Sequence, residues 1–346
     1  MRIGHITLAN RLFAAPMAGV TDRAFRRMCR EYGAGLYVSE MVTSRALWNS
    51  LKTSRRADHR GESDPIAVQI AGTDAAMMAE AAAYNVERGA QIIDINMGCP
   101  AKKVCSKWAG SALMADEALT LRIIDAVVRS VPVPVTVKMR TGTEPGRRNA
   151  VGLARDAESA GAAMITIHGR SRACHYHGTI DYDTIAEVRS RIRLPVVANG
   201  DIDSPRKARA VLEATKADAI MIGRAAQGRP WIFREIAHYL ATGEELEAPE
   251  TLQAKAWLTE HLHDHYGLYG EASGVRSARK HIGWAVHGLP GGAAFRAEMN
   301  LIDDCAAQLR AVEEFFDRLA DTHTRLPATR RAANDDVLAQ DLAQQA

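Results

Sequence analysis

Short apolar runs alternate with amphipathic segments along the first 240 or so residues of the chain. Eight runs rich in Val, Ile, Leu, Met and Ala are predicted to be strands: 12–17, 36–41, 66–71, 92–97, 133–139, 163–168, 195–199 and 219–223. The segments between them repeat apolar residues at helical spacing, and several begin with a capping residue such as Asp116 or Ser204. Strands that are apolar throughout need cover on both faces, which indicates a parallel sheet wrapped in helices. The fold class is therefore α/β, and eight units predict a (β/α)8 TIM barrel.

An open doubly wound sheet is the alternative, but no GxGxxG follows the first strand. After about residue 240 the pattern changes. A polar, acidic linker at 242–251 precedes purely helical patterns at 252–266, 277–286 and 293–319, which glycine-rich stretches separate. We therefore predict a barrel domain over 1–241, a small all-α C-terminal domain over 242–326, and a disordered tail over 327–346.

The composition of the chain indicates its cellular compartment and limits which ligands and partners are expected. The five cysteines of this 346-residue chain are scattered, with no CxxC pair and no spacing typical of metal ligands. We therefore expect neither disulfides nor a metal, and a reducing, cytoplasmic location. No stretch has the length of a membrane span, so no membrane partner is expected, and we expect a monomer. A net charge of +3 does not by itself indicate a polyanionic partner.

Cys99 follows one of the predicted strands directly. The flanking Gly98 and Pro100 force the chain to turn, so the thiol should be displayed at the end of a rigid strand. Such a placement suits a reacting group. A buried cysteine that acts only as a small hydrophobe remains the alternative from this segment alone.

Polar residues follow nearly every other predicted strand. The carboxyl ends of barrel strands converge on one face, so these residues should form one site. They are Pro16, Met17, Ala18, Glu40, Gln69, Asn96, Lys138, Arg140, His168, Arg170, Asn199, Gly200, Asp201, Gly223 and Arg224. Gly200, Gly223 and Arg224 follow the last two strands, which predicts a phosphate-binding corner and hence a phosphate-bearing cofactor. Lys138 and His168 are placed to hydrogen-bond an electron-rich ring.

Basic residues are concentrated in the loops at the predicted barrel mouth. Each alone is typical of a solvated surface, but together they suit the phosphate backbone of an RNA. The loop residues are Lys102, Lys103, Lys107, Arg140, Arg147, Arg148, Arg170, Arg172 and Arg229, and the helical segments add Arg276, Arg279, Lys280, His281 and Arg296.

The ordered motifs resemble those of the tRNA-dihydrouridine synthases, in particular the bacterial B-type branch. The matching segments are 15–22 (APMAGVTD), 68–70 (VQI), 95–100 (INMGCP), 137–140 (VKMR), 167–170 (IHGR), 198–201 (ANGD), 222–224 (IGR) and 279–281 (RKH) with Trp284. The segment 171–176 (SRACHY) departs from the usual pattern of the family, so substrate contacts in that loop are the least defined.

The resemblance implies a role for each matched position. FMN would be held by Pro16, Met17 and Ala18 along the ring, by Gln69, Lys138 and His168 at the ring and ribityl chain, and by Asn199, Gly200, Asp201, Gly223 and Arg224 at the phosphate. Cys99 would be the general acid. Asn96 would position the uracil. The placement of charge at the barrel mouth and on the helical segments, rather than the resemblance, adds Arg140, Arg170, Arg172, Arg279 and Lys280 as substrate-binding candidates.

The implied reaction is a two-stage reduction of a uridine in the D loop of tRNA, with U17 as the expected target. NADPH would reduce FMN, the flavin would pass hydride to C6 of the uracil, and Cys99 would protonate C5. Three rivals remain at this stage. They are a flavin barrel acting on a free pyrimidine, as in dihydroorotate dehydrogenases, a non-catalytic RNA-binding flavoprotein, and a Schiff-base aldolase using Lys138.

Overall fold

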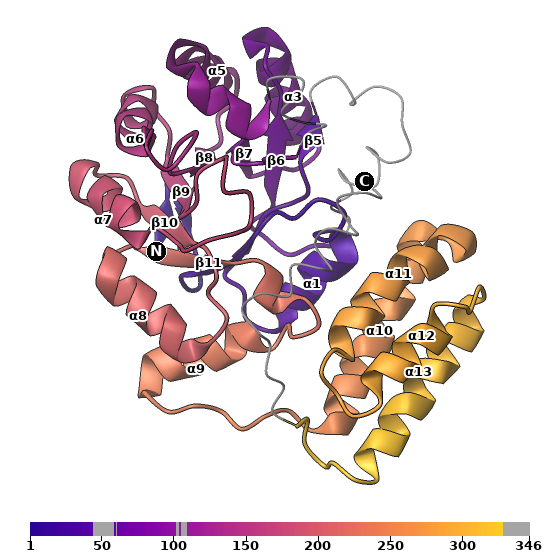
Figure 1. Ribbon diagram of the computed structural model, residues 1–346. Coiled ribbons are helices and arrows are strands. Elements are labelled where there is room, and N and C mark those ends of the chain that lie inside the picture. Colours follow the sequence, from indigo (N-terminus) through magenta and orange to yellow (C-terminus); the bar gives the residue numbers. More distant parts are fainter. Residues whose placement is uncertain (44–58, 60, 102–103, 105–108, 328–346) are drawn as a thin grey trace.

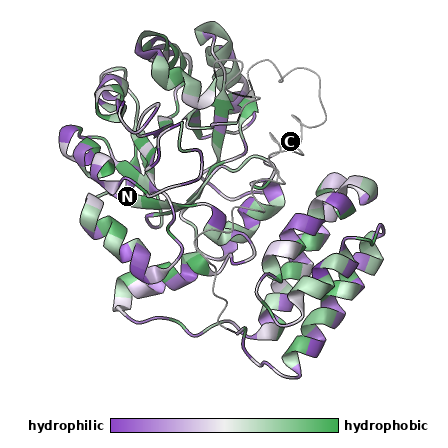
Figure 2. Cartoon of the chain, viewed as in Figure 1, coloured by the Kyte–Doolittle hydropathy of each residue, from purple (hydrophilic) through white to green (hydrophobic). Residues whose placement is uncertain are grey.

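The computed structural model of the chain describes residues 1–43, 59, 61–101, 104 and 109–327. Its main feature is a parallel sheet in the order β4-β3-β11-β10-β9-β8-β7-β6-β5. The strands are β3 (Leu12–Ala14), β4 (Leu36–Tyr37), β5 (Val42–Thr43), β6 (Ala67–Ala71), β7 (Ile92–Met97), β8 (Val135–Arg140), β9 (Met164–His168), β10 (Val196–Asn199) and β11 (Ala219–Ile222). Figure 2 shows these strands as predominantly hydrophobic, as the apolar runs predicted.

The sheet closes on itself into a barrel. β4 pairs with β3 and β5 pairs with β6, so the two short strands are successive halves of one position in the ring. Between them, a parallel bridge joins Val38 to Ala67, and the Ser39 N–H donates to the Ala67 carbonyl at 3.0 Å. Eight strand positions therefore surround the axis, which confirms the (β/α)8 barrel and excludes the open sheet.

Helices cover the outside of the barrel (Figure 1). They are α1 (Arg23–Glu31), α3 (Ala75–Glu87), α5 (Glu117–Ser130), α6 (Ala150–Ser159), α7 (Tyr182–Arg191), α8 (Pro205–Thr215) and α9 (Ile232–Thr242). The predicted caps are present: Asp116 accepts from the Leu119 N–H and Ser204 from the Lys207 N–H. The hairpin of β1 (Arg2–Ile3) and β2 (Ile6–Thr7) places Ile3 against Phe13, in the apolar cluster inside the barrel.

Four further helices form the helical region, residues 251–320. They are α10 (Thr251–Tyr269), α11 (Glu271–Ala285), α12 (Gly292–Met299) and α13 (Cys305–Ala320). Backbone hydrogen bonds from Thr251 to Thr324 (2.9 Å) and from Leu326 to Pro249 (3.0 Å) join the two ends of this region. No helix in the described part of the chain combines the length and the apolar character needed to span a membrane.

Two helix boundaries predicted from the sequence were wrong. The 277–286 helix begins at Glu271 and includes Gly274, where an added Cβ would lie 3.2 Å from Tyr266 Cδ1, so glycine permits α10 and α11 to approach closely. The single 293–319 helix is interrupted, because the Asp304 carboxylate accepts from the Ala307 N–H at 2.6 Å and starts α13 there. The predicted tail lies outside the described residues except for Pro327.

The helical region lies beside α1 of the barrel (Figure 1). The Arg27 guanidinium on α1 contacts Glu260 at 2.7 Å and Asp264 at 3.1 Å on α10. The Lys280 ammonium donates to the Gly19 carbonyl in the loop after β3. The helical region therefore contacts the same loop that carries Pro16, Met17 and Ala18.

A buried ion pair fixes α1 on its other side. The Arg26 guanidinium pairs with the Glu62 carboxylate, and the side chains are 0% and 1% exposed. Arg26 also donates to the Thr21 carbonyl at 2.7 Å. Removing one member of such a pair leaves the other as an uncompensated buried charge, which is far more costly than losing a surface pair.

We predict that Glu62→Gln lowers the free energy of unfolding by about 3–5 kcal/mol, because the buried Arg26 guanidinium loses the carboxylate with which it is paired. The matched control is Glu245→Gln, which breaks the exposed Arg206–Glu245 pair and should cost about 1 kcal/mol or less. Urea unfolding followed by tryptophan fluorescence measures both. Equal effects of the two substitutions would contradict the prediction.

Candidate active site at the mouth of the barrel

The loop that carries Cys99 is fixed on both sides by hydrogen bonds. The Asn96 side-chain oxygen accepts from the N–H groups of Gly98 at 3.1 Å and of Cys99 at 3.0 Å. The Cys99 carbonyl accepts from the backbone N–H of Ser111 at 3.0 Å and from its hydroxyl at 2.9 Å. Cys99 itself is half-buried, so its thiol is held on a short, rigid turn rather than enclosed in the core.

Gly110 makes room for this turn. Its φ is +64°, in the left-handed region, and an added Cβ would lie 2.7 Å from the Cys99 carbonyl oxygen. Both the conformation and the close approach therefore require glycine there. Gly110 begins the short 3-10 helix η1 (Gly110–Ala115), which supplies Ser111.

Asn96 is held in turn by a chain of buried polar side chains inside the barrel. Its NH2 donates to Gln69 Oε1 at 2.7 Å, and Gln69 Nε2 donates to Asp94 Oδ2 at 2.7 Å. The Thr136 hydroxyl donates to Asp94 Oδ1 at 2.6 Å. These residues face one another because Asp94 on β7 is in register with Gln69 on β6 and with Thr136 on β8.

The Asp94 carboxylate determines which groups donate and which accept along this series of hydrogen bonds. An ionised carboxylate only accepts, so the Gln69 amide must turn its NH2 to Asp94 and its oxygen to Asn96. Asn96 then turns its own oxygen to the Cys99 loop. Burial raises the pKa of Asp94 to about 6, against the opposing hydrogen bonds from Thr136 and Gln69.

Lys138 lies on β8, in register with Asn96 on β7. Its ammonium donates to Asn199 Oδ1 at 3.0 Å, and Asn199 Nδ2 donates to the Met221 carbonyl at 2.8 Å. Burial and the neighbouring Arg140 lower the pKa of Lys138 to about 8, while Asp94 and Cys99 act in the opposite direction. The group is therefore still mostly cationic near neutral pH and close enough to Cys99 to interact with its charge.

His168 ends β9 and is neutral. Burial, together with the cations Arg140, Lys138, Arg170 and Arg224, lowers its pKa well below the usual value. Its ring lies 6.5 Å from that of Tyr176, a side chain that is 43% exposed and lies 5.5 Å from the Arg140 guanidinium.

A corner of charged groups lies at the ends of β10 and β11. The Arg170 guanidinium contacts both carboxylate oxygens of Asp201, at 3.1 and 2.6 Å, and Arg224 contacts Asp201 Oδ1 at 2.8 Å. Burial would raise the pKa of Asp201, but the two arginines outweigh it and lower the pKa. Within the described residues, the N–H groups of Gly200, Asp201 and Gly223 donate to no protein acceptor. This corner therefore offers one partly exposed guanidinium and unpaired backbone donors.

The loop after β3 supplies a less polar side of the mouth. Pro16 and Met17 are half-buried and Ala18 is exposed. The Met17 carbonyl accepts from the N–H groups of Val20 and Thr21 at 3.0 Å, which tightens the turn. The Gly19 N–H donates to Glu40 Oε2 at 2.8 Å, so this loop is tied to the next strand position.

Two arginines that we predicted to bind substrate have internal hydrogen-bond partners. Arg140 is buried and donates to the carbonyls of Gly98, Ser171 and His175, and so links the Cys99 loop to the 171–176 segment. Arg170 is buried against Asp201 and the Gly178 carbonyl. Neither guanidinium belongs to the exposed basic rim that the sequence predicted, because unpaired polar groups on these loops needed internal donors.

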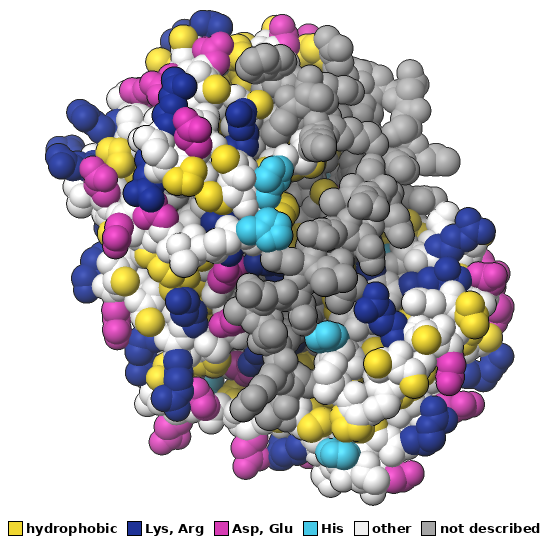
Figure 3. Space-filling view, in the orientation of Figure 1, with side chains coloured by type: hydrophobic (Ala, Val, Ile, Leu, Met, Phe, Trp, Pro, Cys, Tyr) yellow, Lys and Arg dark blue, Asp and Glu magenta, His cyan; other side chains and the backbone are white. Residues whose placement is uncertain are grey.

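The predicted cations of the helical region are also largely paired. Arg279 donates to the Ile302 carbonyl at 3.0 Å and to Asp303 at 2.7 Å, and Lys280 donates to Gly19. Lys102, Lys103 and Lys107 lie outside the described residues. The basic residues that remain open to solvent include Arg147, Arg276 and the half-buried Arg172. Figure 3 shows basic side chains on both the barrel and the helical region on this face, with acidic ones among them.

Sequence reasoning missed two members of the buried polar chain, Asp94 and Thr136. A signal was present, since Asp94 is two residues before Asn96 on an otherwise apolar strand and so shares its face. Thr136 carries no comparable signal, because its pairing depends on the register between β7 and β8.

The fold and these site residues can now be compared with known proteins. A family model described as "Dihydrouridine synthase (Dus)" matches residues 13–320. The tRNA-dihydrouridine synthase B of Pseudomonas aeruginosa is 59% identical over 317 residues, covering 91% of this chain and 96% of the relative. The tRNA-dihydrouridine synthase B of Klebsiella pneumoniae is 54% identical over 321 residues, covering 92% and 100%.

Among solved structures, a complex of morphinone reductase with tetrahydroNAD matches with a TM-score of 0.50 at 15% identity, covering 73% of this chain and 92% of that one. At this identity the match shows the barrel fold alone. The family match spans both the barrel and the helical region, and the relatives are similar along nearly their whole length. The chain therefore belongs to the dihydrouridine synthase family of enzymes.

Proposed function

We propose that this protein reduces the C5–C6 double bond of a uridine in the D loop of tRNA, with FMN as the bound cofactor and NADPH as the reductant. The observation that carries the proposal is the fixed Cys99 turn, which lies at the same end of the barrel as Lys138, His168 and the Asp201–Arg224 corner. Membership of the family favours this reaction over a free pyrimidine substrate, a non-catalytic role or a Schiff-base aldolase.

The donors at the barrel mouth fit FMN. Arg224 and the unpaired N–H groups of Gly200, Asp201 and Gly223 suit a phosphate. The Asp201 carboxylate is already paired with Arg170 and Arg224, so we assign it to holding Arg224 while its N–H faces the phosphate. Lys138 and Gln69 would approach the ring, and Pro16, Met17 and Ala18 would line its other side.

When bound, FMN supplies the hydride that adds to C6 of the uracil ring, having accepted it from NADPH. Cys99 then provides the proton: its S–H bond breaks as a C–H bond forms at C5, which leaves a thiolate. An ordinary thiol has a pKa of about 8.5 and so holds its proton near neutral pH. The Lys138 ammonium stabilises the thiolate that remains, since the two groups are close enough to interact.

Asn96, Gln69 and Asp94 act before the chemical step. They orient the Cys99 turn through hydrogen bonds of 2.7–3.0 Å, so the acid meets C5 without the loop having to reorganise. Beyond the hydrogen bond to Gln69, the Asn96 NH2 makes only a long contact of 4.0 Å to Met41 Sδ, a weak acceptor that a uracil carbonyl would replace. Away from the Cys99 turn, the exposed Arg147 and Arg276 and the half-buried Arg172 would contact the tRNA backbone, and U17 is the proposed target.

We predict that Cys99→Ala lowers the rate of dihydrouridine formation on a tRNA transcript by about 10²–10⁴-fold, because the general acid is lost. Bound flavin per chain and the rate of flavin reduction by NADPH should be unchanged, since Cys99 takes no part in either. Cys305→Ala, at the start of α13, is the matched control and should keep full activity. Unchanged turnover of the Cys99 variant would contradict the proposed role.

We predict a pH dependence that depends on Asp94. Its pKa of about 6 lies above that of the unfolded chain, so the native protein takes up this proton as pH falls through 6. Protonation removes an acceptor and turns the Gln69 amide, so kcat on tRNA should fall below about pH 6. The kcat of Asp94→Asn should be low and should not change with pH around pH 6. Asp125→Asn, on the exposed face of α5, is the control and should keep the pH profile of the wild type. If the kcat of the Asp94→Asn variant fell over the same pH range as that of the wild type, the pH dependence would not come from Asp94.

We predict that tRNA affinity falls steeply with added salt and that Arg276→Ala reduces the slope of log K against log salt by about 1, the effect of one lost phosphate contact. Arg129→Ala, on the outer helix α5 and paired there with Asp125, is the control and should leave the slope unchanged. Filter binding at several salt concentrations measures both. If Arg276→Ala leaves the slope unchanged, as the control does, the RNA does not contact this part of the helical region.

A further inference from the structure

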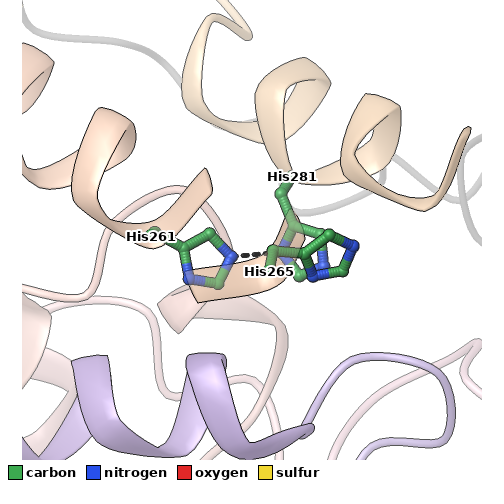
Figure 4. Close-up of side chains that lie close together, drawn as sticks. All are labelled: His261, His265 and His281. Atoms are coloured by element: carbon green, nitrogen blue, oxygen red, sulfur yellow. Dashed lines mark hydrogen bonds between the residues drawn. The ribbon is translucent and has the colours of Figure 1, made fainter. Parts of the chain in front are cut away.

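Three histidines meet in the interior where the helical region contacts α1. His261 and His265 lie one turn apart on α10, and His281 extends toward them from α11 (Figure 4). Their exposed fractions are 3%, 0% and 4%, so bulk water does not reach the rings. No part of the proposed reaction uses them.

The ring nitrogens and one carboxylate are spaced as metal ligands would be. His261 Nε2 lies 3.2 Å from His281 Nδ1, and His265 Nδ1 lies 3.3 Å from Asp22 Oδ2 on the barrel side. Two nitrogens on a tetrahedral zinc ion are about 3.4 Å apart, given a zinc–nitrogen bond of about 2.1 Å. One nitrogen from each ring lies within 4.8 Å of the others, so the three imidazoles need approach by only about 1.4 Å to share an ion.

Within the described residues, two of these four atoms have no hydrogen-bond partner. They are His265 Nδ1 and Asp22 Oδ2, which lie 3.3 Å apart without hydrogen-bond geometry. His261 Nε2 and His281 Nδ1 share the hydrogen bond drawn in Figure 4. Buried polar atoms are almost always paired, so a group of unpaired ones facing each other calls for a further ligand. The other His265 nitrogen contacts Ser277 Oγ at 2.7 Å, which fixes the ring as outer partners of metal-bound histidines do.

We propose that His261, His265, His281 and Asp22 form a structural zinc site that joins the helical region to the barrel. Imidazole nitrogens with one carboxylate oxygen are a donor set that suits zinc, and a closed, buried site is typical of a structural rather than a catalytic ion.

This site departs from our expectation of no metal, which considered only the spacing of cysteines. The pair His261 and His265, four residues apart on a helix, places two imidazoles on one face, but the third and fourth donors come from α11 and α1. Asp22 also caps α1 by accepting from the Phe25 N–H at 2.9 Å. An ion bound there would therefore hold α1 and the adjoining loop after β3 against the helical region.

The first experiment measures zinc in the full-length protein prepared without a polyhistidine tag, in zinc-supplemented medium, after removal of loosely bound metal. Elemental analysis should give about one zinc ion per chain. His265→Gln and His281→Gln should each reduce this at least tenfold. His263→Gln, an exposed histidine on the same helix between the two α10 ligands, is the matched control and should retain the ion.

The second experiment uses only the wild-type chain and so does not depend on how the variants fold. After chelation, added zinc should raise the melting temperature by about 3 °C or more. Cobalt in its place should give the visible absorption of a tetrahedral ion and quench tryptophan fluorescence, since the Trp284 ring lies 5.1 Å from that of His281. Zinc content near zero together with no zinc-dependent stabilisation would overturn the proposal, as would full zinc retention in a folded His265→Gln, His281→Gln double variant.

Discussion

The ionised carboxylate of Asp94 is the constraint on which the order of this site depends. It lies in the barrel interior with both oxygens hydrogen-bonded, one to Thr136 and one to Gln69. A carboxylate cannot donate, so each amide beyond it has only one satisfactory orientation, and the Cys99 turn receives the last acceptor in the series. The buried charge is therefore costly, but it fixes the orientation of the Cys99 turn.

Positive charge dominates the rest of the barrel mouth. Burial and the charges of Lys138, Arg140, Arg170 and Arg224 together lower the pKa of His168 and keep it neutral. Among the described residues, Asp201 offsets two of the four by pairing with Arg170 and Arg224, and the buried Asp94 acts on Lys138. A site so arranged suits the flavin reaction that we propose, since it would attract an anionic cofactor and stabilise negative charge developing on a ring or on a thiolate. Its cations are fixed by internal partners, so little reorganisation is needed when that charge forms.

The strands and the helix caps could be predicted from the sequence, because both depend on local residue patterns. The apolar runs placed all eight strand positions, and Asp116 and Ser204 cap their helices as expected, because a cap depends on residues three positions away. The roles of Arg140 and Arg170 could not be predicted, because their acceptors lie on loops whose approach depends on the closed barrel. The break between α12 and α13 could not be predicted either, because Asp304 lies in a segment whose apolar residues keep helical spacing throughout.

The loop from Pro16 to Asp22 links the two parts of the chain. Its first residues line the barrel mouth, Gly19 accepts from Lys280, and Asp22 faces His265 while it caps α1. Any displacement of α10 and α11 must therefore move this loop or break these contacts. Because the RNA would be bound partly by the helical region and the flavin partly by the loop, the position of the RNA and the geometry around the cofactor depend on the same few contacts. This coupling explains why buried polar side chains are concentrated at the junction, where apolar packing alone would hold the two parts together without fixing their relative position.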